Sequence, residues 1–257
     1  MKDNHIIQGL WIGKTLPAMQ RLSIQSFLSL GHTYHLYAYN DLSGLPLGAE
    51  LKDAGKILPP RLIQRNPTED TYATPFSDMF RYRLLLELGG WWADTDIICL
   101  RPFIFDRDTV FSSEHRIASG VAREVPTITV MKAPPGAEFL CRLYESCQQL
   151  TKGNLDWNDT GSNLLGRVLG EFALNDKVER ATTFCPLPMY VYRLVLDTET
   201  RFVFERATHA IHLWHEKWRR AHLSVDGQFD PGCLYERLKS YLFNDSETVS
   251  VAPFTLE

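Results

Sequence analysis

The feature that most constrains the fold is a pair of carboxylates, Asp94 and Asp96, placed inside an otherwise apolar stretch. The residues before the pair read LLLELGGWWA, and the residues after it read IICL. Such a stretch belongs in a protein core, where an uncompensated carboxylate is destabilising by several kcal/mol. The pair therefore requires a partner, which a bound cation, a basic residue or a turn at the edge of a sheet can supply.

The residues around the pair predict a helix followed by a strand. Apolar residues at helical spacing predict a helix from about Pro75 to Leu88, and two glycines end it because glycine tolerates a positive φ. Residues 91–100 are predicted to form a strand that crosses the pair. In such a strand the two acids share one face, with Cα atoms about 7 Å apart, which suits one hard divalent cation bound with phosphate oxygens. The spacing alone is common on solvated loops, so the apolar surroundings carry the argument.

The rest of the chain predicts a single α/β domain over residues 1–257. Its first part reads as a strand, a helix and a strand, the βαβ start of an α/β fold. No repeat or linker divides the chain. The further predicted strands are 127–133, 201–206 and 208–214, and the further predicted helices are 135–150, 160–172 and 231–243.

Composition excludes some partners and compartments. The chain has 27 Lys and Arg against 31 Asp and Glu, a formal net charge of −4. This balance argues against a nucleic-acid partner and against general binding to anionic membranes, which both need a concentrated basic surface. The one basic segment, EKWRRAH at 216–222, is interpreted as a solvated helix. Five cysteines without a C-x-x-C pair, no signal-like N-terminus and no long apolar run predict a cytoplasmic protein without a transmembrane segment.

The segment FSDMFRYRLLLELGGWWADTDIICLRP, residues 76–102, resembles the D-x-D block of glycosyltransferases of the family 32 type. It is similar also to the glucosyltransferase domain of large clostridial toxins. The resemblance implies a GT-A glycosyltransferase fold, an α/β fold with a Rossmann-like nucleotide-binding sheet and added helices. The nucleotide-sugar-binding part would cover about 1–115, and the acceptor-side and closing part about 116–257.

Three shorter motifs extend the resemblance. LWIG at 10–13 resembles the first-strand motif whose aromatic residue stacks on uracil in the toxins. DTGSNLL at 159–165 resembles the T-G-P block, although Ser162 stands where the family has proline, and Asp159 is implied as a donor-sugar or acceptor contact. HLWHEKW at 212–218 resembles the late motif that closes over the diphosphate.

The resemblance implies a metal ion, Mn²⁺ or Mg²⁺, on the diphosphate of a nucleotide-sugar donor. Asp96 would ligate the ion directly, and Asp94 would lie nearer the ribose and donor sugar and reach the ion through water. His212 aligns with a serine that ligates the metal in the toxins. The catalytic residues would be Asp94, Asp96 and Asp159, and the metal ligands Asp94, Asp96 and His212.

The residues implied to bind the donor come from several parts of the chain: Leu10, Trp11, Ile12, Ser77, Asp78, Arg81, Trp92, Asp94 and Trp214. The residues by themselves leave other interpretations open. Asp78 and Arg81 could form an ordinary surface ion pair, and Ser77 could cap the helix. Trp92 could stack on ribose or pack under the acidic pair.

Two further residues have a structural alternative: Trp11 and His212 could be core residues. Three histidines, His209, His212 and His215, recur every three residues, but on a strand successive ones point to opposite faces, which argues against a zinc site made of all three.

The activity implied is transfer of a sugar from a nucleotide-sugar, UDP-sugar favoured, to an acceptor hydroxyl with retention of anomeric configuration. A glycan or lipid-linked glycan in polysaccharide or glycoconjugate synthesis is the first choice of acceptor, and a protein side chain, as for the toxins, is the second. Two other classes remain as alternatives. One is a non-catalytic nucleotide-sugar-binding protein. The other is a haloacid-dehalogenase-type phosphatase, whose D-x-D follows a first strand near the N-terminus and not a Gly-Gly-Trp-Trp sequence.

Overall fold

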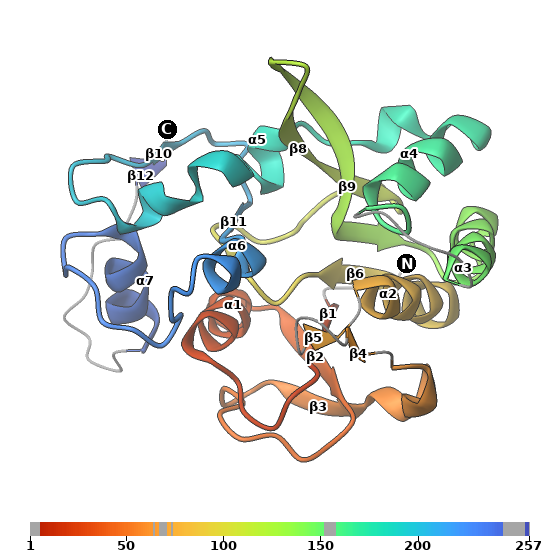
Figure 1. Cartoon of the computed structure of the whole chain (residues 1–257), viewed down its shortest axis with the longest axis horizontal. Coiled ribbons are helices and arrows are strands. Elements are labelled where there is room, and N and C mark those ends of the chain that lie inside the picture. The colour runs from red at the N-terminus through yellow and green to blue at the C-terminus, as the bar shows by residue number, and fades with distance from the viewer. Residues whose placement is uncertain are drawn as a thin grey trace.

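The computed structural model describes residues 6–63, 65–66, 71–72, 74–151, 158–243 and 255–256. In this part of the chain, a six-stranded sheet of order β3-β2-β1-β6-β9-β8 forms the centre of the molecule (Figure 1). The strands β3, β2, β1 and β6 run parallel, and β9 pairs antiparallel with β6 on one side and with β8 on the other. The strands of this sheet are β1 (Ile6–Leu10), β2 (Thr33–Ala38), β3 (Glu50–Asp53), β6 (Gly90–Ala93), β8 (Val110–Ala118) and β9 (Val121–Ala133).

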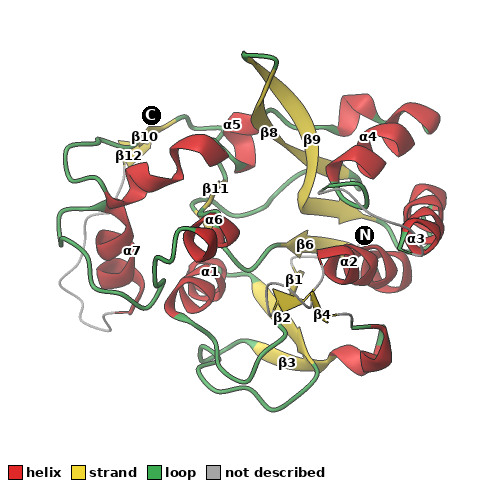
Figure 2. Cartoon of the chain, viewed as in Figure 1, coloured by secondary structure: helices red, strands yellow, loops and turns green. Residues whose placement is uncertain are grey.

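Helices pack on both faces of the sheet, so the domain has three layers (Figure 2). One face carries α2 (Thr74–Leu88), α3 (Glu138–Leu150) and α4 (Ser162–Glu171). The other carries α1 (Ala18–Ser29), α5 (Ala181–Phe184), α6 (His215–Arg220) and α7 (Leu234–Phe243). The expected α/β fold is confirmed: a largely parallel central sheet carries helices on both faces. No helix in the described ranges is both long and apolar enough to cross a membrane.

Smaller elements complete the chain. Three two-stranded sheets pair β7 (Ile97–Cys99) with β11 (Ala210–His212), β4 (Arg65–Asn66) with β5 (Thr71–Tyr72), and β10 (Val203–Phe204) with β12 (Thr255–Leu256). Short 3-10 helices lie at η1 (Ala54–Lys56), η2 (Pro60–Leu62), η3 (Asn175–Lys177) and η4 (Met189–Leu196).

Two glycines end α2 as the sequence predicts. Gly89 has a φ of 63° and Gly90 a φ of 89°, both in the left-handed region. A Cβ atom on Gly89 would also lie 2.5 Å from Cδ of Pro135. The chain can therefore reverse from α2 into β6 only with glycine at this position.

The continuous strand predicted across the acidic pair is wrong. β6 ends at Ala93, residues 94–96 form a turn closed by a bond from Ile97 N–H to the Asp94 carbonyl, and β7 begins at Ile97. The chain turns because β7 leaves the central sheet to pair with β11. The two acids thus lie in a turn at the carboxyl end of β6, the end of an α/β sheet at which ligands bind.

Candidate active site

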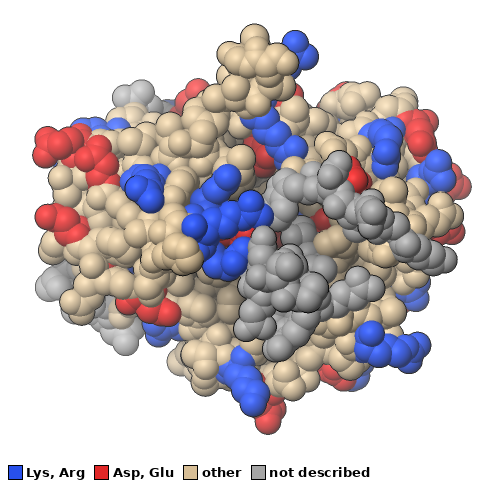
Figure 3. Space-filling model, viewed as in Figure 1, with Lys and Arg blue, Asp and Glu red and all other residues tan. Residues whose placement is uncertain are grey.

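A cavity of about 570 Å³ opens at the carboxyl ends of β1 and β6. Its walls come from α2, the turn after β6, the β8–β9 hairpin, the start of α4 and α6. Lys and Arg side chains gather near the centre of this face of the molecule, over α6 (Figure 3). Most of the residues implied by the sequence line the cavity: Leu10, Trp11, Ser77, Asp78, Arg81, Trp92, Asp94, Asp96, His212 and Trp214.

Asp94, Asp96 and His212 come together in this cavity. Each offers one ligand atom, and these atoms all lie within 4.8 Å of one another. The Nε2 atom of His212 lies 3.1 Å from Oδ2 of Asp96, which also accepts a hydrogen bond of 2.8 Å from the His215 backbone N–H. β11 delivers His212 because it pairs with β7, directly after the acidic turn.

The pKa values of Asp94 and Asp96 are shifted in opposite directions. Burial raises the pKa of Asp96, but His212 and the hydrogen bonds from His212 and His215 more than offset it and lower the value to about 2. Burial raises the pKa of Asp94 above its ordinary value, against the attraction of Arg81. Burial alone would lower the pKa of His212, yet its pairing with Asp96 holds it well above the ordinary value.

Arg81 and Trp92 hold Asp94. Oδ1 of Asp94 lies 3.0 Å from Nη1 of Arg81 and accepts a hydrogen bond of 2.9 Å from the indole N–H of Trp92. The guanidinium of Arg81 also lies 4.9 Å from the centroid of the Trp92 ring. Trp92 is only 2% exposed. It therefore packs beneath the acidic pair and positions Asp94, the second of its two interpretations.

Asp78 and Arg81 are an interior pair. Their side chains are 2% and 5% exposed, and Oδ1 of Asp78 lies 3.3 Å from Nη2 of Arg81. Oδ2 of Asp78 accepts a hydrogen bond of 2.8 Å from Thr160, and Arg81 donates one of 2.7 Å to the carbonyl of Ile128. Burial raises the pKa of Asp78 to about 6, although Arg81 and Thr160 oppose the rise. The surface ion pair that the sequence left open is thus excluded.

The charges of the cluster favour a divalent cation. Three carboxylates, Asp78, Asp94 and Asp96, face two cations, the Arg81 guanidinium and the protonated His212 ring. The cluster therefore carries an excess negative charge, which grows by one when His212 loses its proton to become a ligand. Two carboxylates and one imidazole are donors that Mn²⁺ accepts and that Mg²⁺ accepts less readily. The residues present therefore fit a divalent metal.

Part of the first-strand motif LWIG, residues 10–13, lines the cavity. Leu10 and Trp11 line it, whereas Ile12 packs against the core on the α2 side. Trp11 is half-buried, its indole N–H bonds to the Thr15 carbonyl at 3.0 Å, and its ring centroid lies 6.2 Å from that of His215. The Trp11 side chain therefore lines the cavity next to α6.

Trp214 differs from its expected placement. β11 ends at His212, and Trp214 adopts a left-handed backbone conformation with a φ of 59°. Its ring lies 3.8 Å from the His212 ring, and its indole N–H is donated to the Leu187 carbonyl at 2.8 Å. Trp214 therefore packs on His212 in the cavity wall, and its implied contact with the donor stays a prediction.

Asp159 lies in the turn before α4 and is half-buried. Its neighbours Asn158, Gly161 and Ser162 line the cavity, while Asp159 itself does not. Its assigned role stays a prediction. Of the nearby residues, Ser162 accepts a hydrogen bond of 2.8 Å from Arg116.

The structure adds residues that sequence reasoning missed. Glu114 and Arg116 on β8 pair with each other and face the cavity, as do Thr127 and Thr129 on β9. Residues 112–116 read SSEHR, an unbroken polar run without the alternation that marks a strand, so no strand was predicted there. The basic residues of 216–222 also line the cavity, so the segment interpreted as a solvated helix contributes Lys217, Arg219 and Arg220 to its wall.

Comparison with known proteins supports the resemblance. Residues 20–116 match the family described as "Glycosyltransferase sugar-binding region containing DXD motif". This range includes Asp78, Arg81, Asp94 and Asp96. The match covers less than half of the 257-residue chain. No curated protein matches the chain.

Solved structures that resemble the chain include the PaToxG glycosyltransferase. It is 14% identical with a TM-score of 0.49, over 68% of this chain and 72% of that chain. The ligand-free glycosyltransferase domain from the YGT toxin is 9% identical with a TM-score of 0.44, over 69% and 80% of the two chains. The UDP-bound form of that domain is also 9% identical with a TM-score of 0.44, over 69% and 79%.

Proposed function

Because residues 20–116 match a family of DXD-containing glycosyltransferase regions, we propose that the chain is a metal-dependent, retaining transferase that uses a UDP-sugar. The observation that carries the proposal is the convergence of Asp94, Asp96 and His212, with ligand atoms within 4.8 Å, inside the cavity at the carboxyl ends of β1 and β6. The acceptor is a hydroxyl of a glycan or lipid-linked glycan, in polysaccharide or glycoconjugate synthesis.

Asp96 and His212 are the proposed direct metal ligands, with Asp94 beside them. A divalent cation held there, Mn²⁺ or Mg²⁺, would supply positive charge to stabilise the diphosphate leaving group. Both hydrogen bonds to Asp96 fall on Oδ2, which leaves Oδ1 for a cation. His212 would have to give up its proton to act as a ligand, and its pairing with Asp96 holds its pKa above the ordinary value.

The donor would lie along the cavity between Trp11 and Arg81. Trp11 offers an aromatic surface for a base, and the cations of α6 offer charge for the two phosphates. Asp78 is 1% exposed, so its proposed role is to orient Arg81 toward Asp94 and the donor sugar. The Asp94 carboxylate also accepts a hydrogen bond from the indole N–H of Trp92. This bond orients the carboxylate toward the cavity.

The polar wall opposite α2 is proposed to receive the acceptor. Glu114, Arg116 and Ser162 form a connected set there, and Asp159 stands in the adjacent turn. These groups can bind hydroxyls of an acceptor or donor sugar. A cytoplasmic location is part of the proposal, supported by five free cysteines, of which four are buried.

Release of UDP from a panel of UDP-sugars tests the proposal. The protein should release UDP with Mn²⁺, lose this activity in EDTA and regain it when Mn²⁺ is restored. Asp96→Asn should lose about 10²-fold or more, the scale of one preorganised charge-stabilising group. Asp108→Asn, an exposed carboxylate in the loop before β8, is the matched control and should keep full activity. Full turnover in EDTA would rule out the metal-dependent mechanism.

A further inference from the structure

The β8–β9 hairpin projects from the body of the molecule (Figure 1). Ile117 is 57% exposed and Val121 is 53% exposed, and Ala118 and Ala122 are exposed as well. Single exposed apolar residues are ordinary on a protein surface. Four of them gather at the end of one projecting hairpin, Ile117 with Ala122 on one face and Ala118 with Val121 on the other, so both faces of the tip are apolar.

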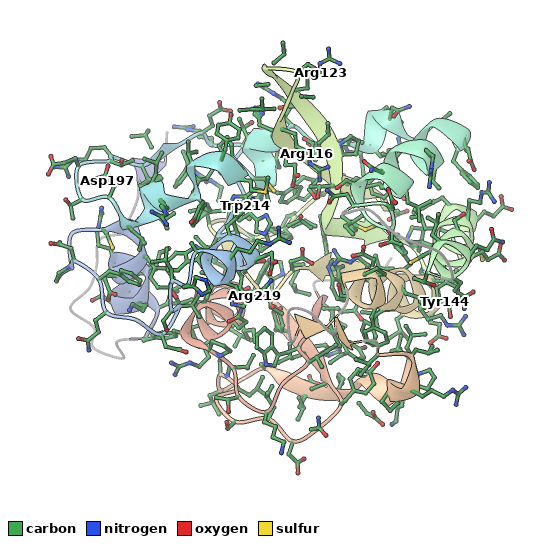
Figure 4. The ribbon with its side chains drawn as sticks, viewed as in Figure 1. Arg116, Arg123, Tyr144, Asp197, Trp214 and Arg219 are labelled. Atoms are coloured by element: carbon green, nitrogen blue, oxygen red, sulfur yellow. The ribbon has the colours of Figure 1, made fainter. Side chains whose placement is uncertain are left out.

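Two arginines lie directly behind this tip. Arg116 and Arg123 are opposite each other in the register of the hairpin, an arrangement that is unfavourable for like charges. Arg116 is paired with Glu114. Arg123 is exposed, and no carboxylate among the described residues pairs with it. The hairpin thus keeps an uncompensated cation next to its apolar tip (Figure 4).

The nearby acid does not cancel this charge. Glu124 follows Arg123, but on the other face of the strand its carboxylate accepts a hydrogen bond of 3.1 Å from the Ala181 backbone N–H. Lysine and arginine side chains of α6 also line the cavity, and Figure 3 shows them on the face of the molecule beside the hairpin. The net charge of −4 therefore conceals a face that is locally basic.

We propose that the β8–β9 hairpin docks the protein on an anionic lipid bilayer. Ile117, Val121 and the two alanines enter the interfacial region, and Arg123 meets the phosphates of the headgroups. A protein partner is disfavoured because a stable protein interface buries about 800 Å² on each partner, more than a narrow convex tip offers. An interfacial element needs only a few apolar residues beside basic ones.

Docking through this hairpin would bring the acceptor side of the cavity to the membrane. Arg116 belongs both to the hairpin and to the cavity wall, so the cavity lies directly behind the docked tip. A lipid-linked acceptor could then reach the cavity without leaving the bilayer. This consequence rests on the proposed function, whereas docking itself can be measured without any donor or catalysis.

Co-sedimentation with vesicles tests the docking. The full chain should bind vesicles of phosphatidylcholine mixed with phosphatidylserine, and should bind vesicles of phosphatidylcholine alone more weakly. The double variant Ile117→Asp with Val121→Asp should lower the partition coefficient by about tenfold or more, since charged residues resist entry into the interface. Arg123→Gln should lower it about fivefold on the anionic vesicles only.

Leu47→Asp provides the matched control. Leu47 is 99% exposed on the loop before β3, far from the hairpin along the sheet, so its variant should bind as the wild type does. Circular dichroism and UDP release from a soluble donor should be unchanged in all of these variants, which separates docking from folding and from the transfer reaction.

A second measurement places the tip at the bilayer. Ala122→Cys, in a background in which the exposed Cys141 is replaced by serine, gives one accessible thiol for an environment-sensitive dye, because the other four cysteines are buried. Its emission should shift to shorter wavelength on anionic vesicles. The proposal is overturned if the wild type does not bind anionic vesicles, if the tip variants bind as well as the wild type, or if Leu47→Asp weakens binding as much as they do.

Discussion

At pH 7 the ionised carboxylate of Asp78 should make the protein less stable than an uncharged side chain at the same position would. Burial raises its pKa from 3.8 to about 6, so the folded protein holds a proton between these values that the unfolded chain has lost. Stability from this group is therefore fully present below pH 3.8 and is lost as pH rises through about 6. A rise of the pKa from 3.8 to about 6 corresponds, at about 1.36 kcal/mol for each pH unit, to a loss of about 3 kcal/mol in unfolding free energy at neutral pH.

Asp78→Asn removes this titration and keeps the size of the side chain. The substitution alters the contacts with Arg81 and Thr160, but that change is a constant offset that does not depend on pH. The difference in unfolding free energy between variant and wild type should therefore move in favour of the variant by about 3 kcal/mol between about pH 4 and pH 7. Donor turnover should fall at the same time, because Arg81 loses the group that orients it.

Urea unfolding at a series of pH values measures this difference, provided that the m-values of the two proteins agree. Asp108→Asn, at an exposed carboxylate, is the control and should show a difference that is nearly constant with pH. A flat difference for Asp78→Asn as well would refute the reasoning, since it would mean that burial does not perturb this carboxyl.

The remaining predictions concern the cavity. Trp11→Ala should raise the dissociation constant for the donor roughly tenfold to a hundredfold with little change in melting temperature, since stacking on a base contributes ~1–3 kcal/mol; unchanged affinity with lowered stability would make Trp11 a core residue. His212→Ala should weaken Mn²⁺ binding, measured by calorimetry, and slow turnover; unaltered metal affinity would remove it from the ligand set. Arg81→Lys should lower turnover, because a lysine cannot contact Asp78, Asp94 and the Ile128 carbonyl together; wild-type activity would contradict the role of Arg81. The product of an α-linked donor should be α-linked, as an NMR coupling constant would show, and a β-linked product would exclude retention.

Local sequence patterns predicted the elements around the site well. The apolar spacing before Gly89 predicted α2, and the two glycines predicted its end because the chain needs a positive φ there. The strand and helix before residue 39 were equally clear. Here the local preference and the tertiary structure agree, so a short window of sequence is enough.

Contacts between distant segments could not be predicted in the same way. The strand expected across Asp94 and Asp96 is broken because β7 pairs with β11, more than one hundred residues later. Polar residues of 112–116 form a strand only because β9 lies beside them, and the hairpin they build was not predicted. The meeting of His212 with Asp96 was inferred from family resemblance, since no local pattern links the two residues.

Partner chemistry was the weakest inference from composition. A net charge averages over the whole chain, whereas binding depends on where the charges lie. Arg219 and Arg220 each pair with Glu216, yet their helix still forms a basic wall of the cavity. The segment that contains them therefore belongs to the site, and only the fold reveals this.

Calorimetric titration of the protein with a UDP-sugar, with Mn²⁺ or with EDTA, tests the central claim most directly. The claim is that Asp94, Asp96 and His212 form a metal-dependent donor site, so binding should be measurable with Mn²⁺ and should weaken at least about tenfold in EDTA or in Asp96→Asn. Asp108→Asn should bind as the wild type does. Equal donor affinity with Mn²⁺ and with EDTA, or equal affinity of Asp96→Asn and the wild type, would contradict the account.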